Sequence, residues 1–289
     1  MKIILFSRRQ LSHTAAEICQ LFNALRLFGF DYAVNEEFAP LVTELTGMQI
    51  PPEKVYGQCI GQQPADEDSG TPERAASCAE SPLAGFKQIN GCPARHLGFL
   101  TSAPSAWLNL IFEEVAAGRL TTEPRSMIEA TGDYAEQPDT ELGLNEFTVQ
   151  RHGAGMISVE TYVDEQMVAT YHGDGVIVST PTGSTAYSLS AGGPVVAPTC
   201  ACLVISPLAP HNLTMRPVVI PDSATITLRV DARRSDAFVT LDSRVYAIGQ
   251  EAAFTIKRAD QKIFLAVPHN ISFYDTLRNK MMWGIDIRS

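Results

Sequence analysis

A run of glycine and hydroxyl-bearing residues, Gly173–Pro194, is the part of the sequence best suited to contact a polar ligand. The apolar stretch Val176–Ser179 predicts a strand that ends in this run. Glycines let a backbone approach a ligand closely, and serine and threonine hydroxyls can donate to or accept from phosphates and ribose. Composition alone favours a set of β-turns, because loops with these residue types are usually only turns.

Two familiar phosphate-binding signatures are missing from the sequence. No Gly-Lys-Ser/Thr follows the glycines of the run, so it is not a Walker A loop. The first apolar stretch, Lys2–Phe6, is not followed by a Gly-x-Gly-x-x-Gly pattern. The cysteines include no Cys-x-x-Cys pair, and Cys200 and Cys202 have no second pair at zinc spacing. We therefore assign no metal ligand.

Composition and charge exclude several classes of protein. The chain has 289 residues, which at roughly 150 residues per domain suggests two domains. Its 32 acidic and 22 basic residues give a net charge of -10, the opposite of the basic footprint of nucleic-acid-binding proteins. No segment reaches the roughly 18 apolar residues of a membrane span, and no signal peptide is recognisable. We expect a cytoplasmic protein with reduced cysteines that binds neither nucleic acid nor membrane.

The first hundred-odd residues alternate strand and helix signals, as parallel α/β sheets do. Lys2–Phe6 and Asp31–Val34 are short strand candidates. A helix is predicted between these two strands, and Thr14 and Glu17 have the spacing of a capping box at its start. A further helix is predicted over about 105–118.

From about residue 145 short apolar runs follow one another, separated by turn residues and without a helical stretch. Thr225–Val230 alternates strictly, which is typical of a strand with one buried face. Phe254–Lys257 and Ile263–Val267 are predicted as two further strands. Strands this frequent indicate an all-β domain. The last segment, Tyr274–Trp283, is helical again.

These patterns predict an α+β protein of two domains. The first is a Rossmann-like α/β domain over residues 1–122, which we expect to bind nucleotide and phosphate. The second is a β-sandwich over 123–270. We expect the C-terminal helix, within 271–289, to pack back on the first domain.

The Gly173–Pro194 run closely resembles the signature of bacterial NAD kinases. The resemblance covers residues 1–50 loosely and 97–289 closely. Its other matching segments are 97–100, 123–126, 144–146, 205–217, 241–244 and 274–280. It implies transfer of the terminal phosphoryl of ATP, or of polyphosphate, to the adenosine-ribose 2′-hydroxyl of NAD, with Mg²⁺ or another divalent cation. It also implies that the β-sandwich binds NAD, with the active site between the domains, and a homodimer or homotetramer.

The resemblance also implies roles for individual residues. Asn145 and Glu146 would hydrogen-bond the ribose or nicotinamide part of NAD, since carboxylates accept well from ribose hydroxyls. His172 falls where the family often has a basic residue, and Arg244 falls at another NAD contact. The remaining predicted NAD-binding residues are Gly70, Asn90, Asp174, Thr185, Ala186, Tyr187, Ser188 and Ser190. Without the motif, His172 would be a partly exposed strand residue and Asp174 a turn residue between two glycines.

One block departs from the family pattern. The family's catalytic loop contains Gly-Gly-Asp-Gly-Thr, whose Asp is the general base for the 2′-hydroxyl. The best match here is Glu67–Thr71, in which Ser69 stands at the Asp position while Gly70 persists. A serine does not accept a proton at pH 7 as a carboxylate does. Glu67 and Asp68 would also repel the phosphates that the glycines should receive.

Three explanations of this block compete. Asp68, one position away, takes over as general base after a register shift. Alternatively, the protein binds NAD or NADP without phosphorylating it, as a catalytically impaired relative. The third explanation is that residues 57–96 are a corrupted reading of an otherwise ordinary enzyme. A lipid kinase of the diacylglycerol type has less support, because Asn145, Glu146 and Thr185–Ser190 match the NAD enzymes specifically.

The third explanation predicts that the DNA encoding residues 57–96 contains the missing loop in another frame. Translating that stretch in all three frames should then yield Gly-Gly-Asp-Gly, since two compensating frameshifts would preserve the codons out of frame. If no frame yields it, the block is genuine and the first two explanations remain.

Overall fold

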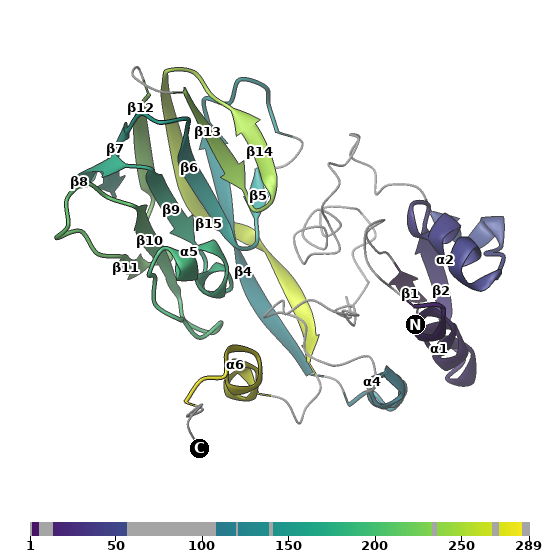
Figure 1. Cartoon of the computed structure of the whole chain (residues 1–289). Helices are drawn as coiled ribbons and strands as arrows, with labels where there is room; N and C mark the ends of the chain where they lie inside the picture. Colours follow the sequence, from purple (N-terminus) through teal and green to yellow (C-terminus); the bar gives the residue numbers. More distant parts are fainter. Residues whose placement is uncertain are drawn as a thin grey trace. The chain divides into compact units, whose positions relative to one another are not determined.

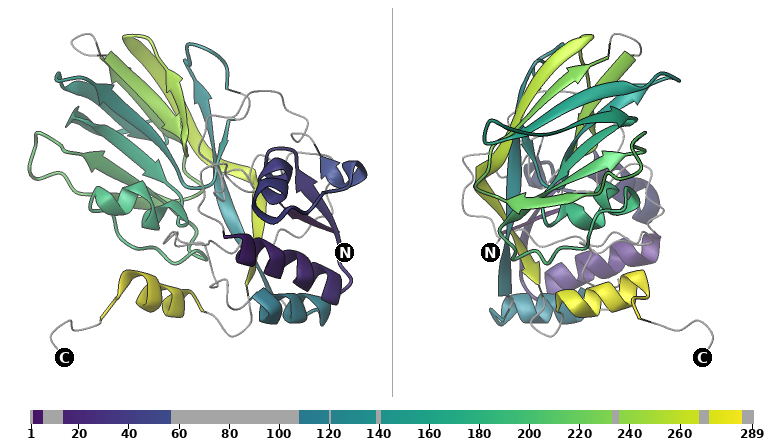
Figure 2. Two further views of the ribbon diagram at one scale, coloured as in Figure 1. Left: turned by 45° about the vertical axis from the view of Figure 1, so that its right-hand side comes forward. Right: turned by 90° about the vertical axis from the view of Figure 1, so that its left-hand side faces the viewer.

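The computed structural model describes residues 2–5, 14–56, 108–119, 121–138, 141–232, 236–267 and 272–284. The chain divides into two compact units, Met1–Glu123 with Phe264–Ser289, and Pro124–Ile263. Figures 1 and 2 show an α/β unit and a β-sandwich, which confirms the predicted fold class. The nucleotide assigned to each domain and the packing of the C-terminal helix on the first domain stay predictions.

A small parallel sheet with its helices forms the first unit. Strands β1, β2 and β3 lie in that order, and both neighbouring pairs are parallel. Phe22, Leu25, Val34, Val42 and Phe112 contribute to the core of this unit. The elements described are β1 (Lys2–Leu5), α1 (Ala15–Leu27), β2 (Asp31–Asn35), α2 (Phe38–Thr46), the 3₁₀ turn η1 (Pro52–Lys54), β3 (Val55–Tyr56), α4 (Leu108–Ala116) and α6 (Phe273–Met281).

The predicted capping box at the start of α1 is confirmed. The Thr14 hydroxyl accepts a hydrogen bond from the Glu17 amide at 3.2 Å, and the Glu17 carboxylate accepts from the Thr14 amide at 2.9 Å. Two backbone donors that a helix leaves without partners are thereby satisfied.

Two six-stranded sheets make up the second unit. Their strand orders are β11-β10-β9-β6-β13-β14 and β5-β4-β15-β12-β7-β8. The pairs β6–β9, β6–β13, β9–β10 and β7–β12 are antiparallel. The strands are β4 (Thr121–Gly132), β5 (Leu142–Gly143), β6 (Glu146–His152), β7 (Ile157–Val163), β8 (Gln166–Gly173), β9 (Gly175–Ser179), β10 (Cys202–Leu208), β11 (Val218–Pro221), β12 (Ile226–Asp231), β13 (Asp236–Leu241), β14 (Arg244–Ala247) and β15 (Glu251–Val267).

Alternating side chains of these strands build the core between the sheets. The predicted face of β12, formed by Ile226, Leu228 and Val230, is buried in this core. In β6, Phe147 and Val149 also enter the core. Successive side chains of a strand point to opposite faces, so the intervening residues of β6 lie on the outer face of the sheet.

The sequence predictions were wrong in two places within the sandwich. The two strands predicted over Phe254–Lys257 and Ile263–Val267 belong to one continuous strand, β15. The second unit also contains helical turns, η3 (Gly183–Thr185) and α5 (Tyr187–Ser190), where no helix was predicted. These turns close through local backbone hydrogen bonds of small residues, so they lack the apolar periodicity of a longer helix.

Helix α2 was not predicted either. Its third residue, Pro40, suggests a break, but proline is tolerated in the first turn of a helix, where the amide would have no partner. Among the described residues no helix is long and apolar enough to cross a membrane.

Replacing Phe254 by alanine should lower the free energy of unfolding by about 3–5 kcal/mol, because a large buried ring leaves a cavity. Phe254 is 1% exposed, and its ring lies 5.1 Å from that of Tyr134 and 5.2 Å from that of Phe147. Phe264→Ala, on the same strand but 52% exposed, is the control and should change stability little. Equal losses for the two variants in urea denaturation would contradict this account of the core.

Candidate functional site

Most predicted site residues that the structure describes gather around neighbouring strands of one sheet. Asn145 and Glu146 stand at the start of β6, and the Thr185–Ser190 segment follows β9. Glu146 pairs with Ser179, so the end of β9 lies beside the start of β6. Arg244 begins β14, which is separated from β9 by two strands, β6 and β13. The predicted residues Asp68, Gly70 and Asn90 lie outside the described residues.

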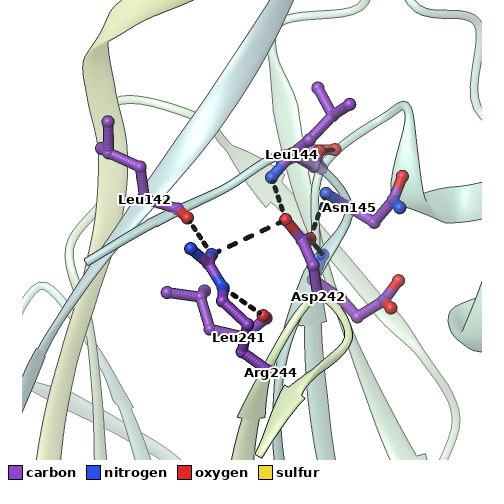
Figure 3. A network of polar contacts seen from close by, with 8 residues as sticks. Leu142, Leu144, Asn145, Leu241, Asp242 and Arg244 are labelled. Carbon is purple, nitrogen blue, oxygen red and sulfur yellow. Dashed lines mark hydrogen bonds and ion pairs between the residues drawn. The ribbon is translucent and has the colours of Figure 1, made fainter. Parts of the chain in front are cut away.

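The carboxylate of Asp242 holds three consecutive backbone amides, those of Leu144, Asn145 and Glu146, which we call the 144–146 segment (Figure 3). One carboxylate oxygen accepts from Leu144 at 2.8 Å. The other accepts from Asn145 at 2.7 Å and from Glu146 at 3.2 Å. The Asp242 side chain is 0% exposed, and its own amide donates to the Glu146 carbonyl at 2.9 Å. The tip of the β13–β14 hairpin is therefore joined to the predicted NAD-binding residues.

Thr180 binds the backbone carbonyl groups of the same segment. The Thr180 hydroxyl donates to the Leu144 carbonyl at 2.6 Å, and the Thr180 amide donates to the Asn145 carbonyl at 2.8 Å. The hydroxyl also accepts from the Gly183 amide at 3.1 Å. Asp242 thus binds the three amides of the 144–146 segment, and Thr180 binds the carbonyls of Leu144 and Asn145. These contacts satisfy buried backbone groups that would otherwise be costly.

Gly183 lies against this segment so closely that a side chain would not fit. A Cβ atom at this position would come within 2.0 Å of the Asn145 carbonyl oxygen. The glycine is needed here for the close approach of two backbones.

The Thr185–Ser190 segment places its residues in different surroundings. Ser188 is fully buried, and its hydroxyl is 3.0 Å from that of Ser206 on β10, which anchors the segment to the sheet. Tyr187 is 39% exposed, and its hydroxyl lies 3.4 Å from the Gln150 side-chain oxygen, a long hydrogen bond. The ring of Tyr187 is therefore accessible to a ligand, whereas the Ser188 hydroxyl already bonds within the protein.

A polar row continues from Tyr187 across the outer face of the sheet. The side-chain amide of Gln150 donates to the Thr148 hydroxyl at 3.0 Å, and that hydroxyl lies 2.6 Å from the Thr240 hydroxyl. Gln150 and Thr148 alternate along β6 with the core residues Phe147 and Val149. One strand thus supplies the core on one face and hydrogen-bonding groups on the other.

His172 and Asp174 lie at the other end of β9. His172 is exposed on β8, and Asp174 stands between β8 and β9, where its carboxylate forms an ion pair with Arg151. Asp174 is therefore a turn residue. Its side chain is 44% exposed, so it is also accessible to a ligand. Asp174 is five residues before Ser179, the partner of Glu146, so at about 3.4 Å per residue it lies roughly 17 Å from the 144–146 segment. A single ligand that touches both must be elongated.

Arg244 is engaged with its own hairpin and the neighbouring loop (Figure 3). Its guanidinium donates to the carbonyls of Leu241 and Leu142 and lies 4.0 Å from the Asp242 carboxylate. It braces the turn that carries Asp242, and a contact with NAD stays a prediction.

Comparison with known proteins identifies the family. The model of the ATP-NAD kinase C-terminal domain matches residues 144–267. The NAD kinase of Flavobacterium psychrophilum is 34% identical over 301 residues, which cover 100% of each chain. That of Flavobacterium johnsoniae is 42% identical over 214 residues, covering 71% of this chain and 73% of its own. The chain belongs to the NAD kinase family.

Solved structures of this family share the fold. Yeast NADH kinase complexed with NADH has a TM-score of 0.78 at 18% identity, covering 99% of this chain and 89% of the yeast chain. An NAD kinase from Archaeoglobus fulgidus in complex with ATP has a TM-score of 0.65 at 20% identity, covering 97% of this chain and 98% of the archaeal one. The match to the family model begins at Leu144, whose amide is the first of the three that donate to Asp242.

Sequence reasoning did not single out Asp242, Thr180 or Gln150. Thr180 lies inside the NAD kinase signature, and Asp242 lies in the matching segment 241–244, so the resemblance covered both positions. Their roles depend on which backbone groups lie opposite them, and the sequence does not show this.

Gly183→Ala should weaken binding of NAD or NADH, because the new methyl group must displace the Asn145 carbonyl. If an overpacking cost of about 1–3 kcal/mol falls on the bound conformation, Kd should rise roughly fivefold or more, measured by NADH fluorescence titration. Gly249→Ala is the control, since its nearest backbone atom would be 3.4 Å from the added Cβ. Unchanged affinity in Gly183→Ala would show that the close approach does not matter for the ligand.

Proposed function

We propose that the protein is an NAD kinase that transfers the terminal phosphoryl of ATP, or of polyphosphate, to the 2′-hydroxyl of the adenosine ribose of NAD. The observation that carries this is the 144–146 segment, fixed between Asp242 and Thr180 within a chain that aligns along its whole length with an NAD kinase. Its Asn145 and Glu146 supply the amide and carboxylate that suit ribose hydroxyls.

The outer face of the sheet fits an elongated dinucleotide. The exposed ring of Tyr187 can pack on a base, and the half-buried side chain of Gln150 offers an amide group beside it. Asp174 can contact the far end of the ligand, about 17 Å away along β9. The acidic net charge is compatible with this, because individual hydrogen-bonding groups hold the ligand.

ATP and NAD are the substrates proposed for this site, and the two solved relatives contain ATP and NADH respectively. Mg²⁺ commonly binds substrate phosphates with one or two carboxylates and several waters, and it neutralises phosphate charge when bound. Among the residues that the structure describes, no group of three or more His, Cys, Asp or Glu side chains could hold a metal ion. The homo-oligomer and the cytoplasmic location stay predictions.

The second candidate is a relative that binds NAD or NADP without phosphorylating it. It rests on Ser69 at the family's Asp position, and that segment lies outside the described residues. The names of the matched relatives support the kinase and neither this candidate nor a lipid kinase.

The purified chain, given NAD, ATP and Mg²⁺, should form NADP. If Asp68 is the general base, Asp68→Asn should lower kcat by about 10²–10⁴-fold, since a lost general base costs that much. Asp66→Asn, two positions away, is the matched control and should keep its activity. Tight NAD binding without NADP formation would support the non-catalytic relative, and full activity of Asp68→Asn would remove Asp68 from the reaction.

A further inference from the structure

Asp242 has an unusual position for a carboxylate. It lies at the tip of the β13–β14 hairpin with a φ of 54°, a left-handed backbone conformation that few non-glycine residues adopt. Its side chain is nevertheless 0% exposed, because it turns toward the 144–146 segment. A buried charge is costly unless hydrogen bonds compensate for it, so the placement calls for an explanation.

Three amide donors satisfy this carboxylate. They come from consecutive residues, and each donates at 2.7–3.2 Å. Hydrogen bonds to an ionised acceptor are stronger than those between neutral groups. The Arg244 guanidinium, 4.0 Å away, adds a positive charge beside the cluster.

Binding three successive amides to one group leaves the backbone of Asn145 and Glu146 little freedom. Thr180 restrains the carbonyls of the same segment, and the Asp242 amide bonds to the Glu146 carbonyl. The directions in which the Asn145 and Glu146 side chains leave the backbone are thereby set.

We propose that Asp242 is a positioning residue for dinucleotide binding: its carboxylate fixes the 144–146 segment so that Asn145 and Glu146 meet the ribose of NAD. The proposal rests on the proposed function and gives a role to a residue that the family resemblance left without one. Asp242 touches no substrate in this account. It acts through the backbone of Asn145 and Glu146, which lie beside it.

Two substitutions separate the carboxylate from the backbone conformation. Asn, like Asp, tolerates left-handed φ values, so Asp242→Asn keeps the hairpin tip and removes the charge and one acceptor oxygen. Asp242→Ala removes every side-chain acceptor. The matched control is Asp222→Asn in the same unit, whose carboxylate is only 12% exposed and accepts from Arg258 at 2.8 Å.

The experiment measures two properties of the full-length chain. Hydrogen exchange of peptides covering residues 142–147 reports whether the amides are held. Fluorescence titration with NADH, together with kcat and KM for NAD, reports whether the side chains are positioned. We expect faster exchange in both Asp242 variants. Kd and KM should rise about tenfold or more in Asp242→Asn, and further in Asp242→Ala, with a smaller change in kcat. Asp222→Asn should leave the exchange rate, Kd, kcat and KM unchanged.

The outcomes distinguish this proposal from the proposed function. Faster exchange with unchanged Kd and KM would show a purely structural role and overturn the proposal, as would unchanged exchange. A parent chain that binds neither NAD nor NADH would contradict the proposed function, and the positioning role of Asp242 would fail with that function. Faster exchange in the Asp242 variants would then still confirm the amide contacts. If Asp242→Ala does not fold, Asp242→Asn still decides.

Discussion

The site depends on one buried carboxylate that binds the amides of three successive residues. This contact is possible because β13 and β6 are paired neighbours, with Leu241 opposite Phe147. The tip of the β13–β14 hairpin therefore arrives beside the residues that precede β6. A slip of one residue in this pairing would move Asp242 away from its partners and turn Phe147 out of the core. The register of the sheet thus specifies both the core and the site.

Fold and function share strand β6. Phe147 and Val149 are buried between the two sheets, while Thr148 and Gln150 belong to the polar row on the outer face. The helical turns after β9 cover part of that face and are anchored through the hydroxyls of Ser188 and Ser206. Because a packed core tolerates little movement, the backbone that carries Thr148 and Gln150 is held in place by the core residues that alternate with them.

Local signals in the sequence predicted the features that local physics determines. The capping box at Thr14 and Glu17 and the buried face of β12 depend on residues within a few positions of one another. The family resemblance located the segments of the site. The role of Asp242 was not predictable, because its partners lie 96 to 98 positions away along the chain. The helical turns of residues 183–190 were missed since their small polar residues show no apolar periodicity.

We propose that the outer face of this sheet binds NAD through the 144–146 segment. A crystal structure of the chain with NAD tests it most directly. We expect ribose hydroxyls within hydrogen-bonding distance of Asn145 or Glu146, with the three amides of the segment still donating to Asp242. A dinucleotide bound away from β6, or a segment released from Asp242 in the complex, would contradict it.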